Sequence, residues 1–234
     1  MSRVVVVTGG NRGIGAAIAE AFLALGDTVA VLSRSGAAPA GTHGFVCDVS
    51  STQSVEAAFT AVEERFGPAE VVVANAGVTK DTLVMRMSDD DLEGVLDTNL
   101  TGSIRVARRA TKPMMKLRRG SLIFIGSVVG LMGNPGQVNY AASKAGLVGA
   151  ARSLARELGG RGITANVIAP GFVDTEMTSV LTDDQRKAMV ERVPLGRYAT
   201  TAEVAGVATF LASEAASYIT GAVIPVDGGL GMGH

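Results

Sequence analysis

The chain has 234 residues, of which 47% are hydrophobic and 4% aromatic, with no tryptophan, and its formal net charge is −1. These values suit one α/β domain with an aliphatic core, and the single cysteine, Cys47, excludes an internal disulfide and favours a reducing compartment. The apolar run Val4–Val7 is too short for a membrane span and lacks the cleavage region of a signal peptide, so we expect a cytoplasmic protein.

Short apolar runs are predicted as seven β-strands: Val4–Thr8, Thr28–Leu32, Phe45–Cys47, Val71–Ala74, Ser121–Ile125, Thr164–Ala169 and Val223–Val226. Most are continuously hydrophobic, which is typical of parallel strands that helices cover on both faces. Helices are predicted between them: Gly13–Leu25, Thr52–Phe66, Thr98–Lys116, Tyr140–Leu158 and Thr201–Leu211. This alternation predicts a single doubly wound parallel seven-stranded sheet with helices on both faces. No linker or repeat interrupts residues 1–234, which we expect to form one domain.

A glycine-rich turn lies between the first predicted strand and the first predicted helix. It contains Gly9, Gly10, Asn11, Arg12, Gly13, Ile14 and Gly15. A sharp bend that lets a pyrophosphate approach the backbone needs residues without a side chain, and the following helix offers free N–H groups and the positive end of its dipole. Glycines also mark ordinary turns, so the position between strand and helix is what favours a dinucleotide site.

The end of the second predicted strand carries no acidic residue. An acid there would accept hydrogen bonds from a ribose 2′-hydroxyl and repel a 2′-phosphate. The chain instead has Ser33, Arg34 and Ser35, and Arg12 lies in the glycine turn. Each arginine alone is as well explained as a solvated side chain, but two guanidinium groups with flanking hydroxyls suit a phosphate dianion. The sequence therefore favours NADP(H) over NAD.

A serine, a tyrosine and a lysine follow the fifth predicted strand. Tyr140 lies thirteen residues after Ser127, and Lys144 lies four residues after Tyr140. Positions four apart share one helix face, so the phenol and the ammonium can reach the same pocket. A free phenol with a pKa of about 10 exchanges protons poorly at neutral pH. A nearby ammonium is expected to lower that pKa.

Residues 175–198 interrupt the alternation of strands and helices. The segment is polar and helix-prone and follows the end of a predicted strand. Ligands of open α/β sheets bind at the carboxyl ends of strands, so the segment is a candidate small helical lid over the substrate. A helical excursion on the surface is the alternative.

These motifs resemble the short-chain dehydrogenase/reductase family over essentially the whole chain. The resemblance is carried by Gly9-x-x-x-Gly13-x-Gly15, Asp48-Val49, Asn75-Ala76-Gly77, Asp97-Thr98-Asn99, Ser127, Tyr140-x-x-x-Lys144, Pro170-Gly171-Phe172-Val173-Asp174-Thr175, Thr220-Gly221 and Val226-Asp227-Gly228-Gly229. It implies a Rossmann-like fold, contacts of Asp48 and Val49 with the adenine, and support of the adenine side by Asn75, Ala76 and Gly77. It also implies that Pro170 and Gly171 line the nicotinamide end and that Val173 and Thr175 hold the carboxamide.

The same resemblance implies a role for each residue of the chemical centre. Tyr140 protonates the carbonyl oxygen as hydride arrives, and Ser127 holds that oxygen. Lys144 lowers the pKa of the tyrosine and binds the nicotinamide ribose, and Tyr140 is expected to contact the cofactor as well. Asn99 positions a water that links Lys144 to bulk solvent. No metal is expected.

Within the family the chain most resembles the β-ketoacyl-[acyl-carrier-protein] reductases. Residues 83–87, 97–102, 125–130 and 139–146 carry this resemblance. It implies reduction of a 3-oxoacyl group on acyl carrier protein in fatty acid biosynthesis. A polyketide, acetoacetyl-CoA or another ketone is an alternative substrate. A non-catalytic NADP(H)-binding sensor is an alternative of another class, against which the intact residues of the chemical centre argue.

The charge distribution suggests an anionic partner. No acidic residue lies between Thr98 and Arg156, a stretch with ten of the chain's 21 Lys and Arg residues. Acyl carrier protein is acidic, and the resemblance implies docking arginines at Arg118 or Arg119 and at Arg161, at the rim of the site. Nucleic acid is another anionic partner, but no recognition motif accompanies the charge.

The predicted helix Tyr140–Leu158 is rich in small residues: Ala141, Ala142, Ala145, Gly146, Gly149 and Ala150. Family members pair this helix and Thr98–Lys116 across a two-fold axis, which implies a homotetramer. The small residues are equally suited to face the sheet of their own subunit. Pro113, inside the predicted helix Thr98–Lys116, predicts a kink or an early end there.

Overall fold

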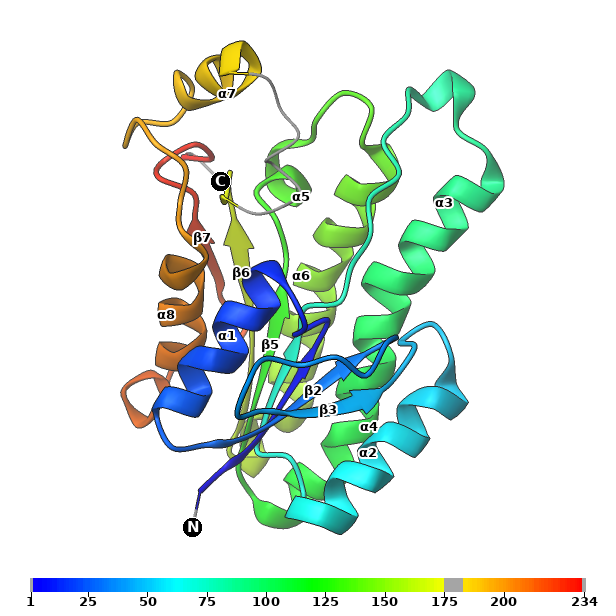
Figure 1. Ribbon diagram of the computed structural model, residues 1–234, viewed down its shortest axis with the longest axis vertical. Helices are drawn as coiled ribbons and strands as arrows, with labels where there is room; N and C mark the ends of the chain where they lie inside the picture. Colours follow the sequence, from blue (N-terminus) through cyan, green and yellow to red (C-terminus); the bar gives the residue numbers. More distant parts are fainter. Residues whose placement is uncertain (1, 175–182, 233–234) are drawn as a thin grey trace.

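The computed structural model describes residues 2–174 and 183–232, which form one open sheet with helices on both faces (Figure 1). All neighbouring strands pair in parallel, in the order β3-β2-β1-β4-β5-β6-β7. The strands are β1 Val4–Thr8, β2 Thr28–Ser33, β3 His43–Val46, β4 Val71–Ala74, β5 Gly120–Ile125, β6 Ile163–Pro170 and β7 Val223–Val226. The predicted doubly wound seven-stranded sheet is confirmed. The strand order changes direction between β1 and β4, where folds of this kind bind ligands.

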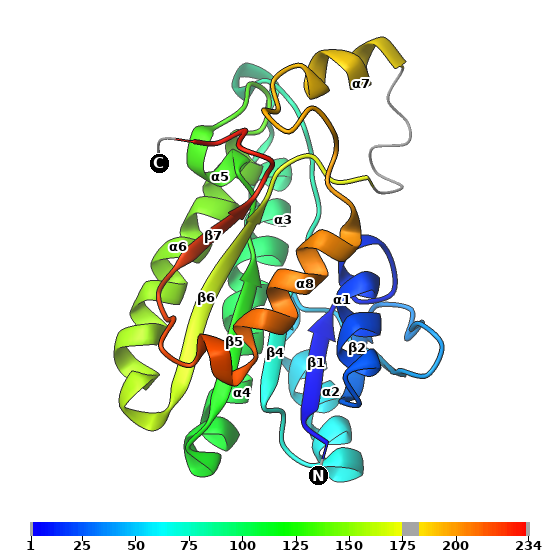
Figure 2. The same cartoon turned by 90° about the vertical axis from the view of Figure 1, so that its left-hand side faces the viewer.

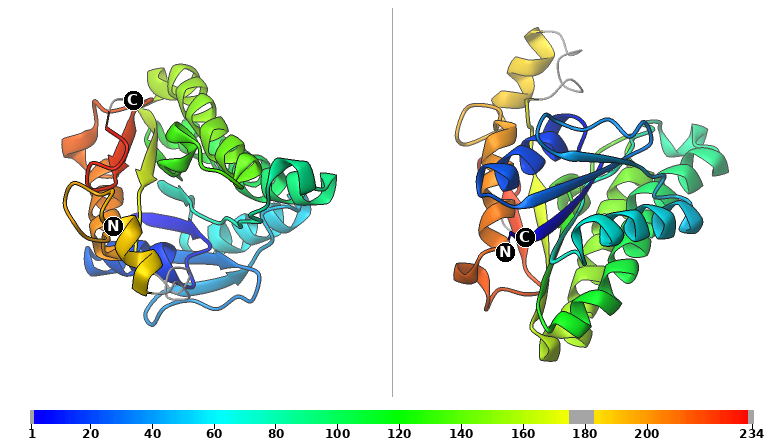
Figure 3. Two further views of the ribbon diagram at one scale, coloured as in Figure 1. Left: turned by 90° about the horizontal axis from the view of Figure 1, so that it is seen from above. Right: turned by 60° about the horizontal axis from the view of Figure 1, so that its bottom comes forward.

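Helices cover the sheet in two layers, which Figures 2 and 3 show from the side and from above. One layer contains α1 Gly13–Ala24 and α8 Thr201–Leu211, and the other contains α2 Thr52–Phe66, α4 Gly102–Leu117 and α6 Val138–Leu158. The shorter helices are α3 Asp89–Leu96, α5 Val129–Met132 and α7 Asp183–Val190, with 3-10 turns at Val84–Arg86, Gly159–Arg161 and Glu214–Ala216. In the part of the chain that the structure describes, no helix is both long enough and apolar enough to span a membrane.

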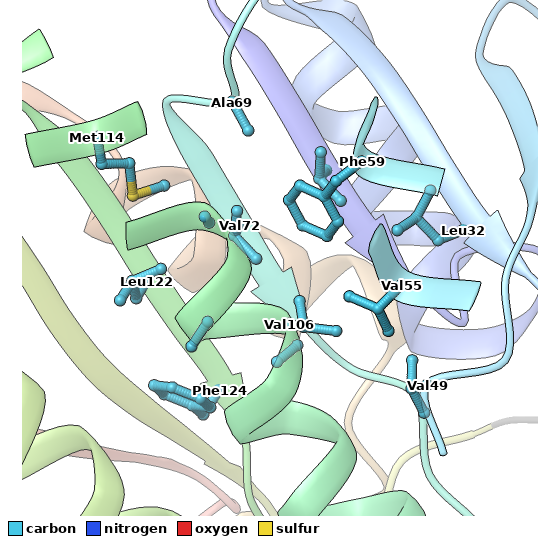
Figure 4. Close-up of a cluster of buried hydrophobic side chains, with 14 of the residues drawn as sticks. Leu32, Val49, Val55, Phe59, Ala69, Val72, Val106, Met114, Leu122 and Phe124 are labelled. Carbon is cyan, nitrogen blue, oxygen red and sulfur yellow. The ribbon is translucent and has the colours of Figure 1, made fainter. Parts of the chain in front are cut away.

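The core is aliphatic and lies on both sides of the sheet. The valines of Val4–Val7 are all buried, and alternate ones point to opposite faces, as the two-residue period of a strand requires. The larger cluster lies under α2 and α4, where Phe59, Val106 and Met114 pack against the strands (Figure 4). A continuously apolar strand sequence is therefore explained by burial on both faces.

The helix predicted to begin at Thr98 begins nine residues earlier. It starts with α3 at Asp89, passes through a π-helical turn at Asp97–Thr101 and continues as α4 without a break. A capping box starts α3, because Ser88 Oγ accepts from the backbone N–H of Asp91 and the Asp91 side chain accepts from the N–H of Ser88. The predicted start at Thr98 was wrong, because this capping box begins the helix at Asp89.

Pro113 does not end α4, which continues to Leu117. Proline has no N–H to donate to the carbonyl of Arg109, four residues before it. Buried Ala110 and Met114 nevertheless hold this turn against the sheet. The early end expected from the proline is therefore wrong, because packing of the apolar helix face outweighs the loss of one backbone bond.

The candidate lid lies partly outside the described residues, and Thr175 is among those outside. Its described part contains α7, which stands above the carboxyl end of the sheet (Figures 1 and 2). At the end of the segment, Tyr198 Oη donates to Met189 Sδ at 3.3 Å. The Tyr198 ring lies 5.9 Å from the ring of Phe172, which follows β6. The segment thus packs back against the cavity wall, and its function as a lid stays a prediction.

Candidate active site

One cavity of about 630 Å³ opens at the carboxyl ends of the strands, at the change in strand order between β1 and β4. It brings together these residues predicted to bind a cofactor: Gly9, Asn11, Arg12, Gly13, Ile14, Gly15, Ser33, Arg34, Asp48, Val49, Asn75, Ala76, Gly77, Pro170, Gly171 and Val173. Ser127, Tyr140 and Lys144 line the same cavity. Asn99 is buried behind the wall, next to Gly77.

The cavity has further lining residues that were not predicted as site residues: Leu32, Cys47, Ser50, Val78, Thr79, Thr98, Ile125, Gly126 and Phe172. All but Thr79 and Ile125 directly adjoin a predicted site residue in sequence, and these two lie one residue further away. The signal that could have found them is the strand-end rule itself, because every loop that leaves a carboxyl end contributes to the rim.

The glycine turn is held in shape by Asn75. Its Nδ2 donates to the carbonyl oxygens of Thr8 at 3.0 Å and Gly9 at 3.1 Å. Gly9 and Gly13 have φ values of 63° and 54°, which favour glycine. A Cβ on Gly15 would collide with Asn75 Nδ2 and with the Gly9 carbonyl. The backbone therefore forms a fixed cradle that only glycine permits.

The cradle and its surroundings fit an NADP(H) pyrophosphate and 2′-phosphate. Helix α1 begins at the turn with no acidic residue in its first turn and no side-chain cap, so its first N–H groups remain available to an anion. The guanidinium groups of Arg12 and Arg34 line the same cavity. Ser33 differs from the expectation, because its hydroxyl donates to the carbonyl of Ala37 at 3.0 Å. The expected phosphate contact therefore falls to the two arginines.

Asp48 is held as a carboxylate at the adenine end. Its Oδ1 accepts from the hydroxyl of Ser50 at 2.6 Å and from the Ser50 backbone N–H at 2.9 Å. These two bonds, with smaller contributions from the charges of Arg34 and Arg105, keep its pKa below the usual value. Asp48 can therefore accept a hydrogen bond from an adenine amino group.

Cys47 also lines the cavity, and the protein surroundings make it unreactive. Its side chain is buried, and desolvation raises the pKa of the thiol to about 11, although a hydrogen bond to Ser54 acts in the opposite direction. The thiol therefore stays protonated at neutral pH, which disfavours a nucleophilic role for this cysteine.

At the chemical centre, Ser127 and Tyr140 line the same cavity, and the Ser127 hydroxyl is near enough to the phenol to act on its pKa. Lys144, 5% exposed, lies behind them, with Nζ 5.6 Å from the centre of the Tyr140 ring and 2.8 Å from the carbonyl oxygen of Ile125, to which it donates. Burial lowers the pKa of Lys144 to about 8. The predicted convergence of phenol, ammonium and serine hydroxyl is present in the structure.

The direction of the Tyr140 pKa differs from the expectation. The pKa is raised, mainly because burial disfavours the phenolate; the Ser127 hydroxyl lowers it, and the negative charge of Asp81 raises it. Lys144 does not lower it here, since its ammonium is bonded to the Ile125 carbonyl and is itself destabilised by burial. The phenol therefore stays protonated at neutral pH but is a weaker acid than a free tyrosine.

Asn99 holds the π-turn and the loop after β4 together. Its Oδ1 accepts from the N–H of Val78 at 2.8 Å, and its Nδ2 donates to the Val78 carbonyl at 3.0 Å and to Ser143 Oγ at 3.1 Å. The π-turn is closed by the N–H of Gly102 donating to the carbonyl of Asp97. Both N–H groups of Asn99 Nδ2 are used, so the expected water would have to donate to an oxygen atom of Asn99, and this role of Asn99 stays a prediction.

The arginines expected at the rim lie elsewhere. Arg118 and Arg119 precede β5 and Arg161 precedes β6, so all three lie at the amino ends of the strands. The six residues of β5 then separate them from Ser127 by about 20 Å at about 3.3 Å per residue. Within one subunit, the expected location at the rim of the site is therefore wrong.

Part of the basic stretch is neutralised inside the molecule. Arg105 pairs with Asp97 at 2.8 Å, and Arg119 pairs with Glu70 at 2.8 Å. Arg109 lies 2.7 Å from carboxylate oxygens of both Glu56 and Glu63 on α2. These carboxylates come from outside the acid-free stretch, so its sequence overstates the positive charge that the surface offers to a partner.

Comparisons with known proteins agree with this geometry. A family model described as enoyl-(acyl carrier protein) reductase matches residues 9–231. The chain is 55% identical over 234 residues to the 3-oxoacyl-[acyl-carrier-protein] reductase MabA of Mycobacterium tuberculosis, covering 100% of this chain and 95% of that protein. It is 45% identical over 238 residues to the 3-oxoacyl-[acyl-carrier-protein] reductase FabG of Escherichia coli, covering 98% of each. With this similarity over the full length of the chain, the chain belongs to the short-chain dehydrogenase/reductase family.

Proposed function

We propose that this protein reduces 3-oxoacyl-[acyl-carrier-protein] to 3-hydroxyacyl-[acyl-carrier-protein] with NADPH in fatty acid biosynthesis. The observation that carries the proposal is the placement of Ser127, Tyr140 and Lys144 in one cavity with the glycine turn. Relatives named 3-oxoacyl-[acyl-carrier-protein] reductases, which match at least 98% of the chain at 45% and 55% identity, support the same substrate class.

The residues act on a carbonyl oxygen. Bound NADPH supplies the hydride that the carbonyl carbon takes up. Ser127 donates a hydrogen bond that holds the oxygen, and Tyr140 gives it the proton that completes the hydroxyl group. The raised pKa of Tyr140 keeps the phenol protonated until the alkoxide that forms on the substrate, a stronger base than a phenolate, takes the proton. Lys144 stands one helical turn from Tyr140 and is placed to assist the return of a proton to the phenol.

Selectivity for NADPH rests on charge. Arg12 and Arg34 border the cavity, and no carboxylate ends β2. A 2′-phosphate would therefore meet two cations, whereas the ribose hydroxyl of NADH would meet no acceptor there. At the other end, the proposal assigns the carboxamide to the Val173 backbone and Thr175, of which Val173 lines the cavity.

The protein is proposed to act as a cytoplasmic homotetramer that receives acyl carrier protein. A groove of about 650 Å³ between α4 and α6, with the partly exposed side chains of Ile104 and Met115, supports the pairing of two copies there. A two-fold axis across these helices sets them antiparallel. The amino-end arginines Arg118 and Arg161 of one subunit would then face toward the carboxyl-end edge of its neighbour.

Enoyl reduction is a second candidate, because the matching family model has that description. Both reactions use hydride from NADPH, but they differ in which bond is reduced. A pair of hydroxyl groups, Ser127 and Tyr140, favours the ketone, whose oxygen carries the developing charge and takes the proton directly.

The decisive experiment is a steady-state assay of NADPH oxidation. The substrates are a 3-oxoacyl and an enoyl group on acyl carrier protein and the same 3-oxoacyl group on a small thiol, each with NADPH and with NADH. We expect reduction of the 3-oxoacyl substrate, a higher kcat/KM on the carrier than on the small thiol, and preference for NADPH. The proposal would be overturned if the enoyl substrate were reduced and the 3-oxoacyl substrate were not. Equal turnover of the 3-oxoacyl group on acyl carrier protein and on the small thiol would show that the protein does not recognise the carrier.

A further inference from the structure

Asn139 lies directly before Tyr140 and is fully buried. Its Nδ2 donates to the carbonyl oxygens of Lys80 at 3.1 Å and Asp91 at 3.0 Å, and its Oδ1 accepts from the backbone N–H of Tyr140 at 2.8 Å. One side chain therefore joins the loop after β4, helix α3 and the start of α6. It stands at the start of the matching stretch 139–146, but no role was predicted for it.

The bond to Tyr140 meets a need of the helix. The first four N–H groups of a helix have no partner within it, and α6 begins without a side-chain cap from Gln137. Asn139 supplies an acceptor for one of these groups, and that group belongs to Tyr140 itself. The backbone position from which the phenol projects is therefore fixed by this side chain.

The loop that Asn139 holds is part of the cavity wall. Asn99 binds both backbone groups of Val78, and Asn139 binds the carbonyl of Lys80. Thr79, between the two anchors, lines the cavity together with Val78. Two buried asparagines thus fix the wall segment at either end.

Two further bonds tie the same wall to the start of α6. The N–H of Thr82 donates to the Gly136 carbonyl at 2.8 Å, and Gln137 Nε2 donates to Asp81 Oδ2 at 2.9 Å. These groups lie at the rim, where water can replace the Gln137 to Asp81 bond. Asn139 is the buried member of the set, so its loss cannot be compensated by solvent.

We propose that Asn139 is a positioning residue for the reduction, which holds the Tyr140 backbone at a fixed place relative to the Val78–Asp81 wall. A substrate that lies against this wall then presents its carbonyl oxygen to the phenol in one geometry. Asn139 touches neither substrate nor cofactor in this arrangement. The inference rests on the proposed function, since it takes Tyr140 as the proton donor.

The test uses Asn139→Asp and Asn139→Ala in the full chain. The aspartate keeps an acceptor for the Tyr140 N–H but places an oxygen against the carbonyls of Lys80 and Asp91, whereas the alanine removes all three bonds. Asn134→Asp is the matched control, because Asn134 is exposed in the same loop and donates only to Gln137 Oε1, at 2.9 Å. Each protein is assayed for kcat and KM with the 3-oxoacyl substrate, for NADPH affinity by fluorescence and for thermal unfolding.

We expect kcat to fall about 10²-fold in both Asn139 variants, the loss that a displacement of about 1 Å at the reacting groups can cause. The Kd for NADPH should stay within about twofold, because the glycine turn and the arginines are untouched. The primary isotope effect on kcat, measured with NADPH deuterated at the transferred position, should rise, because misalignment slows the chemical step. A merely structural residue would not change that isotope effect.

Near-normal kcat in a folded Asn139 variant would overturn the inference, as would a parallel loss of NADPH affinity and kcat. Failure of both variants to fold would also overturn it, since Asn139 would then be a stability residue. These outcomes are distinct from failure of the proposed function, which appears in the unmodified protein as an absence of 3-oxoacyl reduction.

Discussion

Lys144 is a buried cation whose removal should make the protein more stable and inactive. Its pKa is lowered to about 8 from 10.5, burial is the whole cause, and no carboxylate contributes. A shift of this size means that keeping the charge buried at pH 7 costs about 3 kcal/mol relative to the unfolded chain. Lys144→Met fills the space with an apolar side chain of similar length and removes that cost.

The gain in the free energy of unfolding is reduced because the ammonium of Lys144 makes a hydrogen bond. Its bond to the Ile125 carbonyl would be lost, and an unsatisfied buried carbonyl costs about 1 kcal/mol. A net gain of about 2 kcal/mol remains, which corresponds to about 4–8 °C in Tm for a domain of this size. Reduction of the ketone should at the same time be nearly abolished, a trade of activity for stability that is common at functional sites.

The effect also has a pH signature. Between pH 8 and 10.5 the unfolded chain holds the Lys144 proton more tightly than the folded protein, so stability rises with pH in that window. From pH 7 to pH 9 this contributes about 1 kcal/mol in the unmodified protein and nothing in Lys144→Met. Differential scanning calorimetry without nucleotide at pH 7 and at pH 9 measures both the gain in stability and its dependence on pH. Lys112→Met, which replaces an exposed lysine on α4, is the control. The reasoning is refuted if Lys144→Met is no more stable than the unmodified protein at pH 7, or if both respond alike to pH.

Three further predictions concern the cavity. Tyr140→Phe should lower kcat by at least about 10³-fold and leave NADPH affinity within about twofold in a fluorescence titration, because it removes the phenolic proton donor and keeps the aromatic ring in the cavity wall; near-normal turnover would show that another group gives the proton. Arg34→Asp should shift the ratio of kcat/KM for NADPH over NADH by about 100-fold toward NADH, since it exchanges attraction for repulsion at the 2′-phosphate; an unchanged ratio would remove Arg34 from that contact. Gly15→Ala should weaken NADPH binding and lower stability by about 1–3 kcal/mol, because its Cβ would overlap the side-chain amide of Asn75, whereas Gly94→Ala, which has open space, should not.

The sheet and the cavity were predictable because their signals are local and repeat along the chain. Continuous valine runs such as Val4–Val7 are explained by burial on both faces, and every described strand lies within two residues of its predicted position. The carboxyl-end rule then placed Gly15, Ser127 and Tyr140 around one cavity from their order alone.

What the sequence did not reveal depends on contacts between distant segments. Arg105 and Arg109 stand in a stretch without acids, yet carboxylates from outside it neutralise them. The raised pKa of Tyr140 follows from burial, which no spacing of residues encodes. Asn139 carries no local pattern either, since its three partners lie on three separate elements.

The π-turn at Asp97–Thr101 sets where the helix tolerates a change in the number of its residues. Such a turn holds one residue more than an α-helical turn, and each helical residue advances the chain by about 100° and 1.5 Å. Because the extra residue is contained within one turn, deleting a single residue there would convert the π-turn to an α-turn and leave α3 and α4 in nearly the same angular phase. The same deletion in the regular part of α4 would rotate α3 by about 100° relative to the rest of α4, so Asp97–Thr101 is the place where this helix tolerates a change of one residue.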